Sequence, residues 1–551
     1  MYGKWIFGWF FKMTDKPIVL MPDDVQRILG RDAQRNNIWA AKMVADVVKT
    51  TLGPKGMDKM LVSPTGEIIV TNDGVTILSE MQIEHPAAKM LVEISKTQDS
   101  EVGDGTTTVV MLAGKLLENA EKLLDKKIHP TIITKGYKLA AEKAQEILYD
   151  LSLKITPDEE DVLRQIAITA MTGKGAEGSK EKFAEIIVRA VKQIYNNGKI
   201  DVDDIKIEKS RGDGIEDTKL ISGLVLDKEK VSSDMPLAIS NARIALVDFA
   251  LEIKNPEMDT KISISSPEQL QSFIVREERA IKEMIEKVKS SGANVIFCQK
   301  GIDDFAQYLL SKAGIYACRR VARSDMEKLA KATGGKIVSN LNELSASELG
   351  SAEKVEEVKR GDDSLTYITG CRNPKALTIL IHGGTGHIID EVERAIKDGL
   401  GVVISSLKTG LVVPGGGAIE IELARRLRHF GQTLTGREQL AVEEFASALE
   451  FIPLTLAENA GMDPIDVLTE LRSLHDSGNR NMGLNLFENK IGNVLEAKII
   501  EPYKIKNQAI SSASEVATMI LRIDDVIASG GKSGMKGMGG MPGMNPYGGM
   551  D

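Results

Sequence analysis

The stretch that most constrains this chain is Gly103-Asp104-Gly105-Thr106-Thr107-Thr108, because a helix-periodic segment follows it directly. From Val109 to Leu124, apolar residues recur at spacings of three and four, with lysine and glutamate between them. The six residues therefore lie at a helix N-terminus, where unpaired N–H groups and the positive end of the helix dipole suit phosphate. Asp104 is better placed to hold Mg²⁺ than to contact phosphate. An Asp-Gly turn followed by a threonine N-cap explains the same residues equally well.

Three further segments have the composition of phosphate-binding loops: Leu52-Gly53-Pro54, Asp73-Gly74 and Gly415-Gly416-Gly417. Each alone is more often a turn or a helix cap than a ligand site. Asp73-Gly74 is also explained by a hairpin turn between predicted strands at 68–70 and 75–78. Together with residues 103–108, the loops favour one polyphosphate site. The chain has no Walker A motif, since the glycine and strand required before Gly530-Gly531-Lys532-Ser533 are missing.

Composition narrows the classes of partner. The 551 residues are 42% hydrophobic and 27% charged, which predicts a globular protein of several domains. A net charge of −9 and the absence of a long basic run argue against nucleic acid. Three widely spaced cysteines indicate a reducing, cytoplasmic compartment rather than disulfides or zinc. No segment is long and apolar enough to cross a membrane, including the aromatic run at residues 1–12.

The predicted elements divide the chain into regions. Residues up to about 151 are mainly helical, beginning with a predicted helix over 23–50. Strands and helices alternate from about 223 to 378, which indicates an α/β region without a GxGxxG motif. The chain is again mainly helical from 414 to 528 and ends in a Gly/Met-rich low-complexity tail.

Six motifs together resemble the group II chaperonins of the TCP-1/cpn60 family, most closely archaeal thermosome subunits. Their order and spacing fit from about residue 17 to residue 530. The motifs are Thr51–Gly56, Asn72–Thr76, Gly103–Thr108, Asp390–Asp398, Val413–Gly417 and Gln508–Ala513.

The resemblance implies a multidomain fold that combines α+β and α/β parts. A mainly helical, discontinuous equatorial ATPase domain would comprise 17–157 and 413–528. A small intermediate hinge domain would comprise 158–222 and 379–412. An α/β apical domain would comprise 223–378, with a helical protrusion at about 249–280 as a built-in lid. Residues 1–16 are foreign to the family pattern and are expected to be a disordered extension, whose first twelve residues could also be a start-site artefact, and 529–551 a flexible tail.

The resemblance also implies a function. Subunits of this chain or its paralogues would form two stacked rings and hydrolyse ATP to close a chamber around unfolded proteins. Asp104 matches the family's Mg²⁺ ligand, and Asp73 and Asp398 match the pair that activates water. Because Asp398 would arrive from the intermediate domain, hydrolysis would be coupled to lid closure. The residues that match the family's nucleotide contacts are Leu52, Gly53, Pro54, Gly105, Thr106, Thr107, Thr108, Lys174 (the γ-phosphate sensor), Gly416, Asn485 and Glu501 (toward the ribose).

Client binding is expected on the apical protrusion, where exposed apolar groups would meet unfolded chains. The candidates are Ile262, Ile264, Leu270 and Phe273, although Leu270 and Phe273 also fit the packing face of an amphipathic helix. His382 and Gly386 stand where relatives usually carry arginine and an acidic residue, in a loop expected at the hinge.

Two other functions remain as hypotheses. A holdase or scaffold without catalysis would not need the set of Asp73, Asp104 and Asp398. An unrelated α/β enzyme would need a set of catalytic groups within 223–378, where the sequence shows none.

Overall fold

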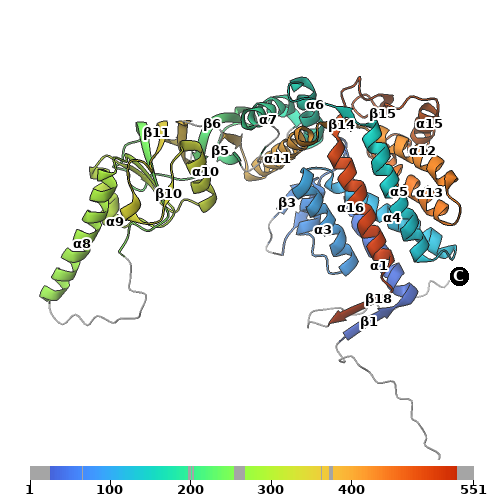
Figure 1. The fold of residues 1–551 in the computed structure, drawn as a ribbon, viewed down its shortest axis with the longest axis horizontal. Helices are drawn as coiled ribbons and strands as arrows, with labels where there is room; N and C mark the ends of the chain where they lie inside the picture. Colours follow the sequence, from blue (N-terminus) through green and yellow to red (C-terminus); the bar gives the residue numbers. More distant parts are fainter. Residues whose placement is uncertain are drawn as a thin grey trace, which may run out of the picture.

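Three packed bodies lie in a row along the computed structural model (Figure 1). The structure describes residues 25–529, except 65, 67, 176, 196–199, 201–203, 254–266, 361–362 and 372–376. We call the three bodies the helical body (residues 25–154 and 411–529), the middle body (helices α6 Glu160–Met171, α7 Lys180–Ile194 and α11 Gly386–Thr409 with strands β5 Ile205–Arg211 and β13 Leu377–Gly383) and the outer body (residues 238–371). The mixture of helices and a large sheet confirms the prediction of a fold that combines α and β structure.

The helical body is built from the two ends of the chain. Its core joins buried side chains from residues 38–148 to buried side chains from residues 413–521. At its centre, most of α4 is buried, and the helix packs against α1, α13 and α16. Its helices are α1 Gly30–Lys49, α2 Gly74–Glu80, α3 Pro86–Val102, α4 Thr106–Asp125, α5 Pro130–Leu151, α12 Ala418–Thr433, α13 Glu438–Leu449, α14 Phe451–Asn459, α15 Pro464–Asp476 and α16 Tyr503–Leu521.

Short strands surround this bundle. β2 Lys59–Val62 pairs with β3 Ile68–Thr71, and β15 Met482–Asn485 pairs with β16 Lys490–Asn493. A three-stranded sheet has the order β17-β14-β4, from Ile500–Pro502, Leu411–Pro414 and Leu153–Lys154.

The two ends of the described chain form a two-stranded ribbon at the edge of the helical body (Figure 1). β1 Val25–Leu29 pairs antiparallel with β18 Asp525–Ser529. The helix predicted over 23–50 is therefore wrong at its start, because α1 begins only at Gly30. A five-residue run is too short for periodicity to separate strand from helix, and the pairing strand is about five hundred residues away.

The hairpin predicted around Asp73 is also wrong. β3 pairs with the preceding strand β2, and residues 74–80 form α2. The Asp73 carboxylate accepts a hydrogen bond from the Thr76 amide at 3.0 Å and so caps this helix. Ile77 and Leu78 are fully buried in the bundle core. The cap and this packing together outweigh the local preference of Asp-Gly for a hairpin turn.

One sheet runs through the middle and outer bodies. Its described strands have the order β5-β13-β6-β12-β11-β7-β8-β9, and β10 also pairs with β7. The domain boundaries predicted at 222/223 and 378/379 fall inside strands β6 and β13. The sheet therefore continues across both predicted boundaries. The strands are β5 Ile205–Arg211, β6 Lys219–Leu226, β7 Ala238–Val247, β8 Val295–Cys298, β9 Tyr316–Cys318, β10 Ile337–Val338, β11 Gly350–Arg360, β12 Asp363–Cys371 and β13 Leu377–Gly383.

The outer body has the predicted alternation of strands and helices. β7, β8 and β9 are parallel, which requires helical crossovers between them. Two separate cores lie on the two faces of the sheet, one under α8 Pro267–Ser290 and α9 Asp304–Lys312, the other under α10 Arg323–Thr333.

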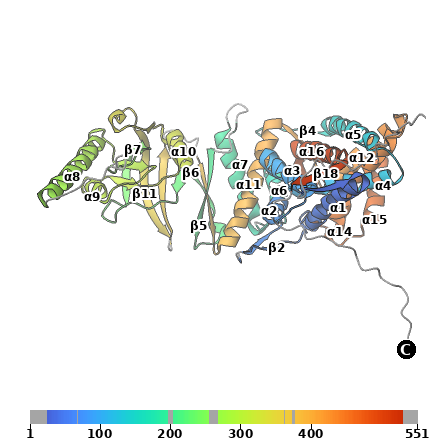
Figure 2. The same ribbon diagram turned by 90° about the horizontal axis from the view of Figure 1, so that it is seen from below.

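The middle body consists of α6 Glu160–Met171, α7 Lys180–Ile194 and α11 Gly386–Thr409, packed on β5 and β13. Figure 2 shows α11 between the outer body and the helical body. Within the residues that the structure describes, no helix is long and apolar enough to cross a membrane.

Candidate active site

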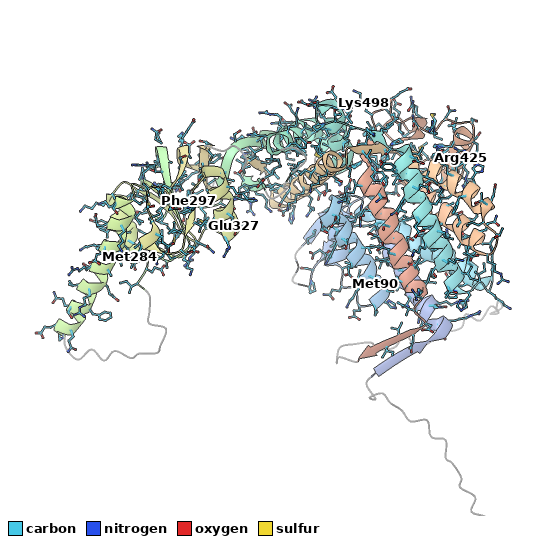
Figure 3. All side chains as sticks on the ribbon, in the orientation of Figure 1. Met90, Met284, Phe297, Glu327, Arg425 and Lys498 are labelled. Atoms are coloured by element: carbon cyan, nitrogen blue, oxygen red, sulfur yellow. The ribbon has the colours of Figure 1, made fainter. Side chains whose placement is uncertain are left out.

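A cavity of about 250 Å³ lies where the helical body meets the middle body. Figure 3 labels Lys498, one of its lining residues, at this junction. All four loops singled out in the sequence line the cavity, which brings together segments more than 300 residues apart. The predicted residues that line it are Leu52, Gly53, Pro54, Asp73, Asp104, Gly105, Thr106, Thr107, Thr108, Lys174, Gly416 and Glu501.

Two helix N-termini face this cavity. α4 has Gly105 at its N-cap and α12 has Gly417, both in the left-handed region with φ of 79°. In the part of the chain that the structure describes, neither N-cap has a side-chain hydrogen bond. The predicted alternative of a threonine N-cap is therefore not what the structure has. Two sets of amide groups remain available to an anion in one place.

Asp73 is held in position by three hydrogen bonds. Its Oδ2 accepts from the amide and the hydroxyl of Thr76, at 3.0 and 2.6 Å. Its Oδ1 accepts from Thr106 Oγ1 at 3.2 Å. The carboxylate that caps α2 is therefore also fixed against the first residue of α4.

Lys174 and Asp398 come to the site from the middle body. Lys174 lies in the turn after α6, and its Nζ is 2.5 Å from Asp398 Oδ2 on α11 and 3.5 Å from Asp104 Oδ1. Asp398 is not itself a lining residue, because the Lys174 ammonium lies between its carboxylate and the Asp104 loop. The site thus joins fixed groups of the helical body to a charge pair of the middle body.

Burial controls the ionisation of these groups. It raises the pKa of Asp398 well above its usual range, and the carboxylates of Asp104 and Asp73 act in the same direction while Lys174 opposes them. Burial works against the charge of Lys174, but Asp104 and Asp398 outweigh it and raise the pKa of this ammonium. Lys174 therefore stays protonated.

Two residues just before the 103–108 segment were missed in the sequence. Gln98 is fully buried, and its Nε2 donates to the carbonyls of Asp104 at 3.1 Å and Ile505 at 3.2 Å. Burial, followed by the charges of Asp73 and Asp104, raises the pKa of Asp99. A signal for Gln98 was present, since it shares a helical face with Leu91, Ile94 and Val102.

The far end of the cavity holds Glu501 but not Asn485. Asn485 Oδ1 accepts from the Phe487 amide at 3.2 Å, and its Nδ2 donates to Glu488 at 3.1 Å. Leu484 and Leu486 line the cavity, and successive residues of an extended segment point to opposite sides. The structure therefore does not bring the side chain of Asn485 to the site. Lys506, which no motif indicated, lies 2.6 Å from Glu501 Oε2.

The predicted client residues are mostly beyond what the structure describes. Ile262 and Ile264 lie outside the described residues, as does the side chain of Leu270. Phe273 lies on α8 with 39% of its surface exposed, beside the exposed Ile274 and Val275. Client binding at these positions stays a prediction.

The comparison with known proteins decides the family. Residues 44–530 match the model of the TCP-1/cpn60 chaperonin family. This chain belongs to that family. The match confirms the resemblance predicted from the six motifs and identifies the class of function as chaperonin-assisted protein folding.

Near full-length relatives agree with this chaperonin assignment. The chain is 56% identical over 518 residues to a thermosome subunit of Methanopyrus kandleri, covering 93% of this chain and 95% of the relative. It is 55% identical to the thermosome subunit beta of Archaeoglobus fulgidus, covering 95% and 97%. It is 54% identical to the subunit alpha of the same organism, covering 95% and 96%.

The donor set fits a magnesium ion that is bound together with a polyphosphate. Mg²⁺ is usually held by one or two carboxylates plus substrate phosphates. Asp104 supplies one such carboxylate beside two uncapped helix N-termini. Across the described residues, no group of three or more His, Cys, Asp or Glu side chains forms a metal site by itself.

Proposed function

We propose that this chaperonin subunit hydrolyses ATP with Mg²⁺ to drive closure of a chamber in which unfolded proteins fold. The observation that carries the proposal is the cavity between two bodies. The helical body supplies two uncapped helix N-termini, Asp73 and Asp104, and the middle body supplies Lys174 and Asp398. A scaffold without catalysis has no need of this set.

The helical body would bind the nucleotide. The amides at the starts of α4 and α12 would bind the phosphates, together with the loop at 52–54. Asp104 would hold Mg²⁺, which neutralises the charge that develops on the transferred phosphoryl group. Glu501 would accept hydrogen bonds from the ribose hydroxyls. We leave Asn485 out of the site because its side chain closes its own turn.

Asp73 and Asp398 would have different tasks in hydrolysis. Asp73 is fixed by Thr76 and Thr106, which suits it to orient the attacking water. Asp398 would accept the proton of that water, and its raised pKa suits a general base. Because Lys174 occupies the Asp398 carboxylate here, this role requires the ammonium to turn toward the γ-phosphate when ATP is bound.

The division between bodies would couple hydrolysis to motion. Asp398 and Lys174 approach the cavity only when the middle body packs on the helical body, as it does here. We assign the helical body to the equatorial domain, the middle body to the intermediate domain and the outer body to the apical domain with its lid. Movement of the middle body away from the helical body would therefore withdraw the base.

We also propose that the chain assembles with copies or paralogues of itself in two stacked rings in the cytoplasm. The β2–β3 hairpin supports assembly, because its outward face carries Met60 at 67%, Val62 at 65% and Ile68 at 45% exposure. An apolar face on a short two-stranded sheet is costly to leave in water. The names of the Archaeoglobus fulgidus relatives, subunits alpha and beta, agree with paralogous partners.

Two measurements test the proposal. The purified protein should hydrolyse ATP in the presence of Mg²⁺ and lose that activity when Mg²⁺ is chelated. Electron micrographs under native conditions should show double rings. Absence of ATPase activity from an assembled, folded sample would overturn the enzymatic assignment, and a monomer or small dimer would overturn the assembly.

A further inference from the structure

A largely buried group of three charges lies beside the cavity, next to the loop at 415–417. Lys506 Nζ lies 2.6 Å from Glu501 Oε2 and 2.7 Å from Glu420 Oε1. Lys506 and Glu420 are 8% and 4% exposed. One ammonium thus binds two carboxylates from different elements, away from bulk water.

The three charges connect three elements at or next to the cavity. Lys506 is on α16, Glu501 is on β17, and Glu420 is in the first turn of α12, directly after the loop at 415–417. Gly415 leaves room for the Glu501 side chain, because a Cβ at Gly415 would lie 2.7 Å from Glu501 Oε1. The position of Glu501 is thus set by Lys506 on one side and by the absence of a side chain on the other.

Stability is a weak explanation for this arrangement. Buried ion pairs often contribute little to stability when compared with apolar residues of the same size. Here the group also carries one excess negative charge, since two carboxylates share one ammonium. Lys506 occupies one oxygen of Glu501, while Glu501 and Lys506 both line the cavity. A carboxylate that one ammonium holds in place and that lines a cavity suits a hydrogen-bond acceptor for a ligand hydroxyl.

We propose that Lys506, anchored by Glu420, is a positioning residue that holds Glu501 to accept hydrogen bonds from the ribose of the nucleotide, and so selects ribonucleotides over deoxyribonucleotides. This inference rests on the proposed ATPase function. A site built to bind a hydroxyl discriminates strongly against the analogue that lacks it, because its own polar group is then left without a partner. Glu501 touches the ligand, whereas Lys506 acts through Glu501.

The test compares ATP with 2′-deoxy-ATP and 3′-deoxy-ATP as substrates of the assembled protein. The wild-type protein should prefer ATP over at least one analogue by about tenfold or more in kcat/KM, as expected for a hydrogen bond to a charged group. The preference should reside in KM, since the ribose contact is the same in the ground state and the transition state.

The decisive variant is the double substitution Lys506→Met and Glu420→Gln. It keeps the net charge of the group at one negative, because it removes one positive and one negative charge together. Lys506→Met alone leaves two buried carboxylates without a cation and is the variant at risk of misfolding. In the double variant, the preference for ATP over the deoxy analogue should fall by about fivefold or more, as in Glu501→Gln. Adding Glu501→Gln to the double variant should cause little further loss.

Lys504→Met is the matched control. Lys504 is on the same helix, pairs with Glu101 at 3.2 Å and does not line the cavity. It should leave the preference unchanged. Glu420→Gln alone retains the ion pair of Lys506 and Glu501, so this variant should keep most of the preference for ATP over the deoxy analogues.

The outcomes separate the inference from the proposed function. A wild-type protein without Mg²⁺-dependent ATPase activity contradicts the proposed function. An active wild-type protein that hydrolyses both deoxy analogues as well as ATP overturns the role of Glu501 and with it that of Lys506. An active, folded double variant that retains the wild-type preference overturns the role of Lys506 alone.

Discussion

Lys174 Nζ lies 2.5 Å from Asp398 Oδ2, although the two residues are 224 positions apart in the sequence. Both belong to the middle body, and both face Asp104 of the helical body. The middle body therefore presents a cation and a carboxylate together to the fixed part of the site.

The first prediction concerns pH. Burial raises the pKa of Asp398, and Lys174 opposes that rise. Because the base must be ionised, kcat/KM should fall as pH drops through a value above the usual 3.8 of an aspartate. Lys174→Met removes the cation that favours the carboxylate, so the acid limb should move to higher pH. The profile of kcat/KM is the appropriate measurement, since it reports the free enzyme.

Lys397→Met is the control for this profile. Lys397 neighbours Asp398 in sequence, but its ammonium pairs with Glu393 and is 59% exposed. Its loss should leave the acid limb in place. If the acid limb stays fixed in Lys174→Met or moves to lower pH, the Lys174 ammonium does not favour the ionised carboxylate of Asp398, and this prediction is wrong.

The second prediction concerns the magnesium loop. Gln98→Met removes the donor to the carbonyls of Asp104 and Ile505 and should cost about 1–3 kcal/mol of stability. Because Gln98 fixes the backbone of Asp104, the Mg²⁺ concentration for half-maximal ATPase should rise several-fold. Gln307→Met, at another buried glutamine that donates to a carbonyl in the outer body, should lower stability without shifting the Mg²⁺ dependence. Equal Mg²⁺ dependence in both variants would rule out that Gln98 positions Asp104 for the metal.

The third prediction concerns the stability of the helical body. Glu422 is 1% exposed and binds Arg425 and Arg426 at 2.8 Å and His475 at 3.1 Å. Burial opposes its ionisation, but His475 and the two arginines outweigh burial and hold the pKa of Glu422 well below its usual range. Glu422→Gln should lower the free energy of unfolding at neutral pH by about 2 kcal/mol, because it removes the carboxylate that the partly buried guanidinium groups of Arg425 and Arg426 share.

The sign of the pH dependence follows from the lowered pKa. The contribution of Glu422 is present above its unfolded pKa of about 4.5 and is lost as pH falls from there toward the native value. The difference between wild type and Glu422→Gln should therefore shrink in acid. Glu443→Gln, at a 52% exposed partner of Arg428, should cost less than about 1 kcal/mol at any pH. Equal costs for the two variants in denaturant unfolding would refute the account.

The fourth prediction concerns assembly. Met60→Lys combined with Val62→Lys alters only exposed positions of β2, so the folded subunit should change stability by less than about 0.5 kcal/mol. If the hairpin packs against a neighbouring subunit, the buried lysines should break the rings into smaller species in sedimentation velocity. Leu237→Lys, at a 60% exposed leucine of the outer body, should leave them intact. Intact rings in the double variant would exclude the hairpin from the interface.

Long periodic segments were predicted well from the sequence. α4 carries its apolar residues over five turns, and the glycines before it explain why the chain turns into the cavity. The joining of both chain ends into one bundle has no signal in periodicity and came only from the resemblance to chaperonins. The strand β1 and the helix α2 were mistaken because partners far along the chain, together with the cap at Asp73, decide their conformation.

The site residues that belong to a sequence motif were predicted, whereas those that reach the site only through packing of distant segments were missed. Gly105 and Thr106 follow from the motif itself. The role proposed for Lys506 depends on its ion pairs with Glu420 and Glu501, which belong to two other elements. Spacing in the sequence carries no information about such a contact. A buried lysine or glutamine on an otherwise apolar helical face was the only signal available.

The most direct test of the account is the comparison of wild type with Asp398→Asn in ATP binding and in single-turnover hydrolysis, both with Mg²⁺. Binding of ATP should stay within about threefold of wild type, because the nucleotide contacts belong to the helical body. Hydrolysis should slow by about 10²- to 10⁴-fold, as for loss of a general base. Hydrolysis at a near-normal rate, or loss of ATP binding, would contradict the claim that the middle body supplies the base to a site formed by the helical body.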